Sequence, residues 1–353
     1  MRASPPKYLI VGPSWVGDMV MADSLYRLLL AREPGAEIDV VAPSWSLPIL
    51  ERMDEVRHAI ELPVAHGETA IARRHRVGRA LRGRGYTHAI VLPRSWKSAL
   101  VPFFARVPTR TGYRGEWRYG LINDMRSPAA AKRSRTVERF AALGLQRGEQ
   151  ALPPLDPPRL RVEARAQAAL LGRVGLGASA EIVALLPGAE YGPAKQWPAE
   201  YYADLAARLA RVGVDVCVLG SAKERELGES IRKAAAAARV HNLCGETTLA
   251  EVVDLLGAVR IAVSNDSGLM HVAAATGAHV VALYGSSSPR MTPPLTSRQN
   301  VFYLGLECSP CFERTCPLVH MRCLRDMAVD DVCSTVITLL GEPRSSREAW
   351  TRA

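Results

Sequence analysis

Short apolar runs alternate with helix-like segments along the chain, and this alternation restricts the possible folds more than any other feature. We predict buried strands at residues 8–11, 38–42, 89–92, 182–186, 215–219, 261–264 and 280–284. Helical patterns lie between them, at about residues 19–32, 71–82, 137–143, 163–171 and 201–212. Strands that alternate with helices form parallel, doubly wound sheets. The sequence therefore predicts the α/β fold class.

A proline-rich stretch at residues 152–158 divides this pattern, because proline cannot continue a helix or a central strand. The chain has 353 residues, enough for two hydrophobic cores. We predict two Rossmann-like domains, at residues 1–157 and 158–341, and a polar C-terminal tail at 342–353. Ligands of such sheets bind beyond the carboxyl ends of the strands, so we expect the two domains to face an interdomain cleft.

The hydropathy of the chain excludes an integral membrane protein. Mean hydropathy is −0.01, and charged residues or proline interrupt every apolar run before it reaches the roughly 20 residues that span a bilayer. The N-terminal residues show no apolar signal-peptide region and no small-residue cleavage site. We expect the protein to stay in the cytoplasm.

Basic residues are concentrated in the first half of the chain. Residues 1–150 hold 24 Lys and Arg against 14 Asp and Glu, and residues 71–139 hold 17 against three. Such a density favours nucleic acid, an anionic membrane surface or a polyanionic substrate, although a merely solvated basic face is the alternative. The stretch lacks interleaved aromatics and any helix-turn-helix signature, so we expect no nucleic-acid partner.

The first predicted strand is followed by a loop that ends in an acidic residue. Residues 12–17 have the glycine spacing of a P-loop, but Asp18 stands where a phosphate site needs lysine. The dinucleotide fingerprint G-x-G-x-x-G is also absent, which argues against a nicotinamide enzyme. Asp18 has two interpretations: a carboxylate that stabilises a helix start, or a general base.

A strand in the second half runs through Asn-Asp-Ser-Gly into a helix. Free N–H groups at that helix start can bind a diphosphate. Gly268 allows a ligand to approach the backbone closely, and Ser267 can donate a hydrogen bond from its hydroxyl. Asp266 can orient nearby amides or accept a hydrogen bond from a sugar hydroxyl. His271 shares their side of the first turn, although a lone histidine is more often structural. The alternative is a helix that is capped and has no ligand.

Two loops of the second half add to a nucleotide-diphosphate site. Lys195 lies among Gly and Pro residues after a predicted strand, a setting that suits contact with a phosphate. Ser221 follows the next strand in a small-residue turn and would line the same edge of the sheet.

Four of the seven cysteines lie close together, at Cys308, Cys311, Cys316 and Cys323. The first pair has the C-x-x-C spacing of a zinc site. A structural zinc or iron–sulfur site and unligated thiols both remain open, and neither has a part in catalysis.

Five segments of this sequence, at residues 12–19, 98–104, 110–116, 187–195 and 265–271, resemble the ADP-heptose:lipopolysaccharide heptosyltransferases. They are more similar to the type II enzymes than to type I. The resemblance runs in order from about residue 8 to about residue 295. It implies a GT-B fold and an inverting, metal-independent transfer of L-glycero-D-manno-heptose from ADP-heptose to the first heptose of the lipopolysaccharide inner core.

The resemblance also implies roles for individual residues. Asp18 corresponds to the general base and Lys195 to the cation on the departing diphosphate. The donor-holding segment corresponds to Asp266, Ser267, Gly268 and His271, with Glu190, Tyr191 and Ser221 as neighbours. The residues expected to face the anionic acceptor are Ser14, Arg94, Lys97, Arg110, Arg114 and Arg118.

The implied acceptor is a glycolipid, and its lipid A phosphates and Kdo carboxylates would explain the basic first half. We expect peripheral association with the anionic inner face of the inner membrane. The alternatives are a heptosyltransferase that acts on Kdo-lipid A and a nucleotide-sugar epimerase of the same fold.

Overall fold

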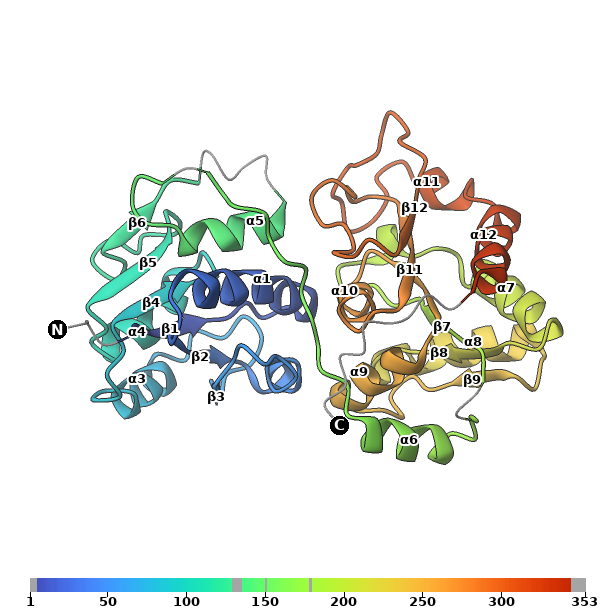
Figure 1. Cartoon of the computed structure of the whole chain (residues 1–353). Coiled ribbons are helices and arrows are strands. Elements are labelled where there is room, and N and C mark those ends of the chain that lie inside the picture. Colours follow the sequence, from blue (N-terminus) through green and yellow to red (C-terminus); the bar gives the residue numbers. More distant parts are fainter. Residues whose placement is uncertain (1–4, 129–134, 150, 178–179, 344–353) are drawn as a thin grey trace. The chain divides into compact units, whose positions relative to one another are not determined.

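The computed structural model describes residues 5–128, 135–149, 151–177 and 180–343 (Figure 1). It divides into two compact units, residues 1–159 and 160–353. The division falls two residues after the boundary predicted at 157. Of the predicted tail at 342–353, residues 344–353 lie outside the described residues.

The first unit is a six-stranded sheet in the order β3-β2-β1-β4-β5-β6, with every neighbouring pair parallel. Its strands are β1 (Lys7–Val11), β2 (Glu37–Ala42), β3 (His58–Glu61), β4 (His88–Val91), β5 (Thr109–Tyr113) and β6 (Asp124–Arg126). Its helices are α1 (Val16–Arg32), α2 (Leu47–Leu50), α3 (Ile71–Ala80), α4 (Leu100–Phe104) and α5 (Thr136–Ala141). The helices connect the strands as crossovers (Figure 1).

The second unit repeats this plan with the order β12-β11-β10-β7-β8-β9, again with parallel neighbours. Its strands are β7 (Ile182–Leu186), β8 (Asp215–Val218), β9 (Val240–Asn242), β10 (Ile261–Asn265), β11 (His279–Tyr284) and β12 (Gln299–Tyr303). Its helices are α6 (Ala164–Arg173), α7 (Ala199–Arg211), α8 (Arg225–Ala235), α9 (Leu249–Ala258), α10 (Gly268–Ala275), α11 (Arg322–Arg325) and α12 (Val329–Gly341).

The central strands form the cores of the two units. Strands β7 and β10 are buried at every position, and β1 and β2 at all but their first residue. In the second unit Trp197 and Tyr202 pack edge to face on this core, with ring centroids 5.0 Å apart. Burial of such aliphatic and aromatic surface contributes about 25 cal/mol per Å². The predicted fold class, α/β with two Rossmann-like units, is confirmed.

The structure also contains five strands that the sequence interpretation did not predict: β3, β5, β6, β9 and β12. Among the described residues, no helix has both the length and the apolar character needed to cross a membrane.

Candidate active site

The turn between β1 and α1 places Asp18 at the carboxyl edge of the first sheet. Gly12 donates its N–H to the Val41 carbonyl at 2.9 Å, and a Cβ at this glycine would lie 2.6 Å from Cε of Met19. Because the turn is this tight, α1 begins at Val16 and Asp18 lies in its first turn. The positive end of the helix dipole favours an ionised carboxylate at this place. Both interpretations of Asp18, as a general base and as a residue that stabilises the helix start, require this ionised form.

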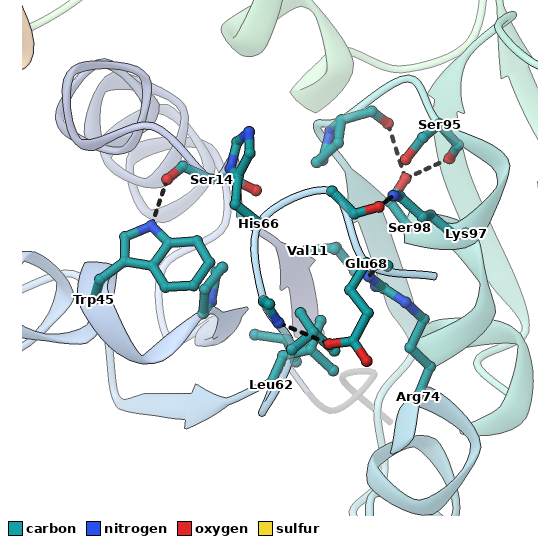
Figure 2. Close-up of a pocket in the computed structure, with 17 residues that line it drawn as sticks. Val11, Ser14, Trp45, Leu62, His66, Glu68, Arg74, Ser95, Lys97 and Ser98 are labelled. Carbon is teal, nitrogen blue, oxygen red and sulfur yellow. Dashed lines mark hydrogen bonds between the residues drawn. The ribbon is translucent and has the colours of Figure 1, made fainter. Parts of the chain in front are cut away.

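A pocket of about 210 Å³ lies at the same edge of the first sheet, beyond the ends of β1, β2 and β4 (Figure 2). Val11 and Gly12 form part of its floor, and most of its other walls are polar. The polar and aromatic side chains that line it are Ser14, Trp45, His66, Glu68, Arg74, Ser95, Lys97 and Ser98. Ser14 and Lys97 were predicted from the sequence. The others were not, because they come from separate parts of the chain: the segment after β2, the loop of residues 62–70, helix α3 and the segment after β4.

One wall of the pocket is the loop of residues 62–70, and basic side chains hold it in place. Nζ of Lys97 donates to the Gly67 carbonyl. The Arg74 guanidinium donates to the Thr69 carbonyl at 2.7 Å and to the Glu68 carbonyl at 3.2 Å. The two cations therefore fix the loop, and they leave a positive potential at the pocket wall.

Aromatic rings form another part of the lining, and one of them, His66, belongs to this same loop. The His66 ring lies 5.1 Å from the Trp15 ring and 6.4 Å from the Trp45 ring, measured between centroids. Nε1 of Trp45 donates to the Ser14 carbonyl at 2.8 Å (Figure 2). A wall of exposed aromatic faces beside hydroxyl and cationic groups offers both stacking and hydrogen bonding, which suits a polar ring such as a sugar.

The four arginines expected to face an acceptor differ in exposure. Arg94 and Arg114 are exposed. Arg110 donates to the carbonyls of Val107, Gly120 and Leu121, at 2.6–3.3 Å. Arg118 is completely buried and donates to the carbonyls of Tyr113 and Pro93, and burial lowers the pKa of Arg118 to about 10.

Because its guanidinium is used by backbone carbonyls, Arg118 stabilises the β5–β6 connection. The expectation that Arg118 faces the anionic acceptor is therefore not met, because its side chain is buried against the backbone.

In the second unit, Asn265 at the end of β10 fixes the loop that carries Lys195. Its Nδ2 donates to the Pro187 carbonyl at 2.7 Å, and its Oδ1 accepts from the Trp197 N–H and the Tyr202 hydroxyl, both at 3.0 Å. Both ends of the loop of residues 187–197 are therefore held by one buried side chain. The sequence interpretation quoted Asn265 within its motif but gave it no role.

This anchoring brings Lys195 to Asp266. Nζ of Lys195 lies 2.6 Å from Oδ2 of Asp266, and the two side chains are only 17% and 6% exposed. Oγ1 of Thr292 lies 3.5 Å from the other carboxylate oxygen. The ammonium keeps two further N–H donors, so it can face an anionic ligand while Asp266 orients it.

Several buried polar atoms beside this pair have no partner among the described residues. They are Nδ1 of His271 and the hydroxyls of Ser286 and Ser287. His271 is fully buried on α10, and burial lowers its pKa to about 4, so its ring is neutral at pH 7. Ser286 and Ser287 follow β11, which pairs with β10. Unpaired buried donors are rare in native proteins, and a bound ligand is one way to satisfy them.

The segment of residues 309–314 supports this site from outside. Nζ of Lys195 and the Arg314 guanidinium each lie 5.0 Å from the centroid of the Tyr191 ring. The Tyr191 hydroxyl donates to the Phe312 carbonyl at 2.6 Å, and the Phe312 N–H donates to the Ser286 carbonyl at 2.7 Å. The segment therefore supports both the loop of residues 187–197, which carries Lys195, and the turn that carries Ser286 and Ser287.

Glu190 and Ser221 lie at the ends of β7 and β8 but bond to neighbouring residues. Lys223 Nζ is 2.8 Å from Oε1 of Glu190. Ser221 caps a short helical turn and bonds to Glu224. Glu224 also lies against Gly188, 3.0 Å from the place of a Cβ. Polar groups therefore line this edge of the candidate site. Glu224 was not among the residues predicted from the sequence.

The cysteine cluster gives no support to the predicted zinc or iron–sulfur site. Cys308, Cys311, Cys316 and Cys323 form no disulfide bond. Within the part of the chain that the structure describes, no three His, Cys, Asp or Glu side chains come together as a metal site. Burial raises the pKa of Cys323 to about 11, so this thiol is protonated at neutral pH.

Two Rossmann-like units with these groups at their carboxyl edges are typical of glycosyltransferases that take a sugar from a nucleotide diphosphate. A model of glycosyltransferase family 9 (heptosyltransferase) matches residues 74–322, and the chain belongs to this family.

Curated relatives agree with the family assignment. The chain is 48% identical to lipopolysaccharide heptosyltransferase 2 of Salmonella typhimurium over 306 residues, which cover 84% of this chain and 88% of the relative. It is 44% identical to lipooligosaccharide heptosyltransferase 2 of Haemophilus influenzae, with the same coverage. The solved structure of E. coli ADP-heptose lps heptosyltransferase II is similar with a TM-score of 0.85 and 43% identity, over 95% of this chain and 98% of that one.

Proposed function

We propose that the protein transfers L-glycero-D-manno-heptose from ADP-heptose to the first heptose of the lipopolysaccharide inner core, with inversion at the anomeric carbon. One observation carries most of the proposal: the Lys195–Asp266 pair lies beside unpaired buried donors at the carboxyl edge of β10 and β11. It supports a diphosphate site in a chain whose relatives are named heptosyltransferase 2.

The second unit is the donor-binding part in this proposal. Diphosphate oxygens accept from Lys195 Nζ, from N–H groups at the start of α10 near Ser267 and Gly268, and from the Ser286 and Ser287 hydroxyls. Helix α10 begins at Gly268 without a side-chain cap, which leaves its first N–H groups available to an anion. Glu190, Tyr191 and Ser221 line the rim. Neutral His271 offers Nδ1 without adding charge.

The first unit is the acceptor-binding part, with Asp18 as general base. The pocket beside α1 takes a sugar ring of the glycolipid against Trp45 and His66. Ser14, Lys97 and the exposed Arg94 and Arg114 face its anionic groups, and Arg110 lies behind them.

With these proposed roles, the reaction is as follows. The Asp18 carboxylate takes the proton from an acceptor hydroxyl while that oxygen forms a bond to the anomeric carbon. The bond from this carbon to the diphosphate oxygen breaks, and its electron pair leaves with ADP. Negative charge then grows on the diphosphate, where the Lys195 ammonium and the fixed N–H donors stabilise it most. No step requires a metal ion.

We also propose that the enzyme acts at the cytoplasmic face of the inner membrane, as a peripheral protein. Its acceptor is a membrane glycolipid, and the excess of basic residues lies in the acceptor-binding unit.

The decisive experiment measures ADP release from ADP-heptose with two purified acceptors, one with a single heptose on its Kdo and one with Kdo only. We expect turnover with the first acceptor alone, and a rate about 10²–10⁴-fold lower in the Asp18→Asn variant. Turnover with the Kdo-only acceptor would instead show a type I enzyme, and loss of ADP-heptose without any acceptor would favour an epimerase or a hydrolase.

A further inference from the structure

Besides Trp15 and Trp45 near the pocket, three further aromatic side chains of the first unit are exposed to solvent. Trp117 is 90% exposed, Tyr119 65% and Phe103 41%. Exposed indole and phenol rings have no role in the core of this unit, and neither Trp117 nor Tyr119 lines the pocket. Exposed aromatic clusters of this kind mark interaction surfaces.

Arg110 joins these aromatics into one face. Its guanidinium donates to the Gly120 carbonyl at 3.3 Å and to the Leu121 carbonyl at 2.6 Å, which fixes the loop that carries Trp117 and Tyr119. The same guanidinium lies 5.7 Å from the centroid of the Phe103 ring on α4. The loop and the end of α4 are therefore neighbours.

Exposed arginines border this face where α3 packs on α4. Nε of Arg82 donates to the Phe104 carbonyl at 2.8 Å. Desolvation lowers the pKa of Arg82, and the nearby charges of Arg106 and Arg79 lower it further, so both of these guanidinium groups lie near that of Arg82. Among the described residues, none of the three forms an ion pair.

We propose that Phe103, Trp117 and Tyr119, together with Arg79, Arg82 and Arg106, form a membrane-docking face that binds the surface of an anionic lipid bilayer. This inference refines the proposed function, because it names the part of the chain that holds the enzyme at its glycolipid acceptor.

The chemistry of the face matches a bilayer surface. Tryptophan and tyrosine prefer the headgroup level, where the ring is shielded from water and its polar atom stays wet. Anionic headgroups supply the counter-charges that the three arginines lack within the described chain, and each basic residue near such a surface adds roughly fivefold to binding. An aromatic cluster with a rim of unpaired cations is typical of proteins that lie on membranes.

The docking face is also connected to the pocket. Trp96 donates its N–H to Oε2 of Glu116 at 3.2 Å, and Gly115 packs on the Arg94 carbonyl so closely that a Cβ would lie only 2.4 Å from it. The loop that carries Trp117 is thus attached to residues 93–98, which contribute Ser95, Lys97 and Ser98 to the pocket wall. Docking would hold the pocket near the sugars of a membrane-embedded glycolipid.

The first experiment measures co-sedimentation with vesicles of phosphatidylcholine that contain 30% phosphatidylglycerol, at low salt, against pure phosphatidylcholine. We expect the wild type to bind the anionic vesicles, and the double variant Trp117→Ser/Tyr119→Ser to bind at least tenfold more weakly. The matched control is Leu318→Ser/Val319→Ser, which removes two exposed apolar side chains from the second unit. Equal binding by both double variants would overturn the proposal.

The second experiment tests the cations. Replacement of Arg79, Arg82 and Arg106 by Gln should weaken binding by roughly a hundredfold, at about fivefold for each residue. The control with the same net charge replaces the exposed Arg211, Lys233 and Arg290 of the second unit. A similar loss in both triple variants would show an effect of net charge alone, and the docking face would be abandoned.

Insertion is measured separately by tryptophan quenching with brominated lipids. Quenching should fall in Trp117→Phe, which keeps an apolar ring, while vesicle binding is largely retained. Unchanged quenching would place the lipid contact elsewhere. A mass in solution that halves in Trp117→Ser/Tyr119→Ser would show that the face binds a second copy of this chain, which would also refute the proposal.

Turnover with a water-soluble, delipidated acceptor distinguishes failure of this inference from failure of the proposed function. We expect the docking variants to keep their rate on that acceptor and to lose rate on acceptor embedded in vesicles. No turnover by the wild type on either acceptor would refute the proposed function, while vesicle binding would still test the docking face.

Discussion

The substitution Asn265→Ala tests how the donor site is held together. Asn265 is completely buried and makes three hydrogen bonds, to Pro187, Trp197 and Tyr202. Removal of its amide leaves a buried carbonyl, an N–H and a hydroxyl without partners, each at a cost of about 1–3 kcal/mol. Some relaxation of the neighbouring groups is expected, so the free energy of unfolding of the second unit should fall by about 3–5 kcal/mol.

Urea unfolding, followed by tryptophan fluorescence, measures this loss directly. The control is Tyr202→Phe, which removes one of the three bonds and should cost about 1 kcal/mol. The Asn265→Ala variant should also bind ADP roughly tenfold more weakly under native conditions, which corresponds to about 1.4 kcal/mol, because the loop of Lys195 loses both of its anchors. A loss of stability no larger than that of Tyr202→Phe would refute the reasoning, since it would mean that the three bonds do not act through Asn265.

Three further predictions concern the reacting groups. Asp18→Asn should lower kcat by about 10²–10⁴-fold in the ADP-release assay and leave the Kd for ADP nearly unchanged; comparable turnover would remove Asp18 from the mechanism. Lys195→Ala should weaken ADP binding in calorimetry and also lower kcat, since it is proposed to touch the diphosphate before and during transfer; an unchanged affinity would place Lys195 away from the phosphates. Burial lowers the pKa of His271 to about 4, so between about pH 6.5 and pH 4 the unfolded chain binds one more proton than the folded chain. The free energy of unfolding should therefore fall by about 2–3 kcal/mol as pH falls through this window. Urea midpoints measured across this window should decline less steeply in His271→Gln, and an equally steep decline in the variant would contradict the assignment.

The sequence predicted the centre of each sheet and missed its outer strands, for a physical reason. Strands such as β7 (Ile182–Leu186) and β10 are covered on both faces, so they appear as continuous apolar runs. The outer strand β6 is Asp-Met-Arg and none of its residues is fully buried, and β12 is also only partly covered. Without burial there is no apolar signal, and only pairing with a neighbour defines these strands.

The candidate site shows the same limit. Lys195 and Asp266 could be predicted because each follows a strand in a loop whose residue types suit an anion, and the structure brings them to 2.6 Å. Trp45 and His66 could not, because nothing in the local sequence of either loop indicates that the two rings meet at one pocket. The prediction for Arg118 was wrong in the opposite way. As a basic residue in a basic stretch it was expected at the surface, but its side chain is buried and its guanidinium donates to the carbonyls of Tyr113 and Pro93.

Residues 309–314, which support the candidate donor site, belong to the cysteine-rich region of the chain. This span contacts Tyr191, in the loop that carries Lys195, and it donates a backbone hydrogen bond to Ser286, in the turn after β11. Cys311 directly precedes Phe312, whose backbone N–H and carbonyl form the hydrogen bonds to Ser286 and Tyr191. The cysteine-rich region therefore contributes to the position of the loop that carries Lys195.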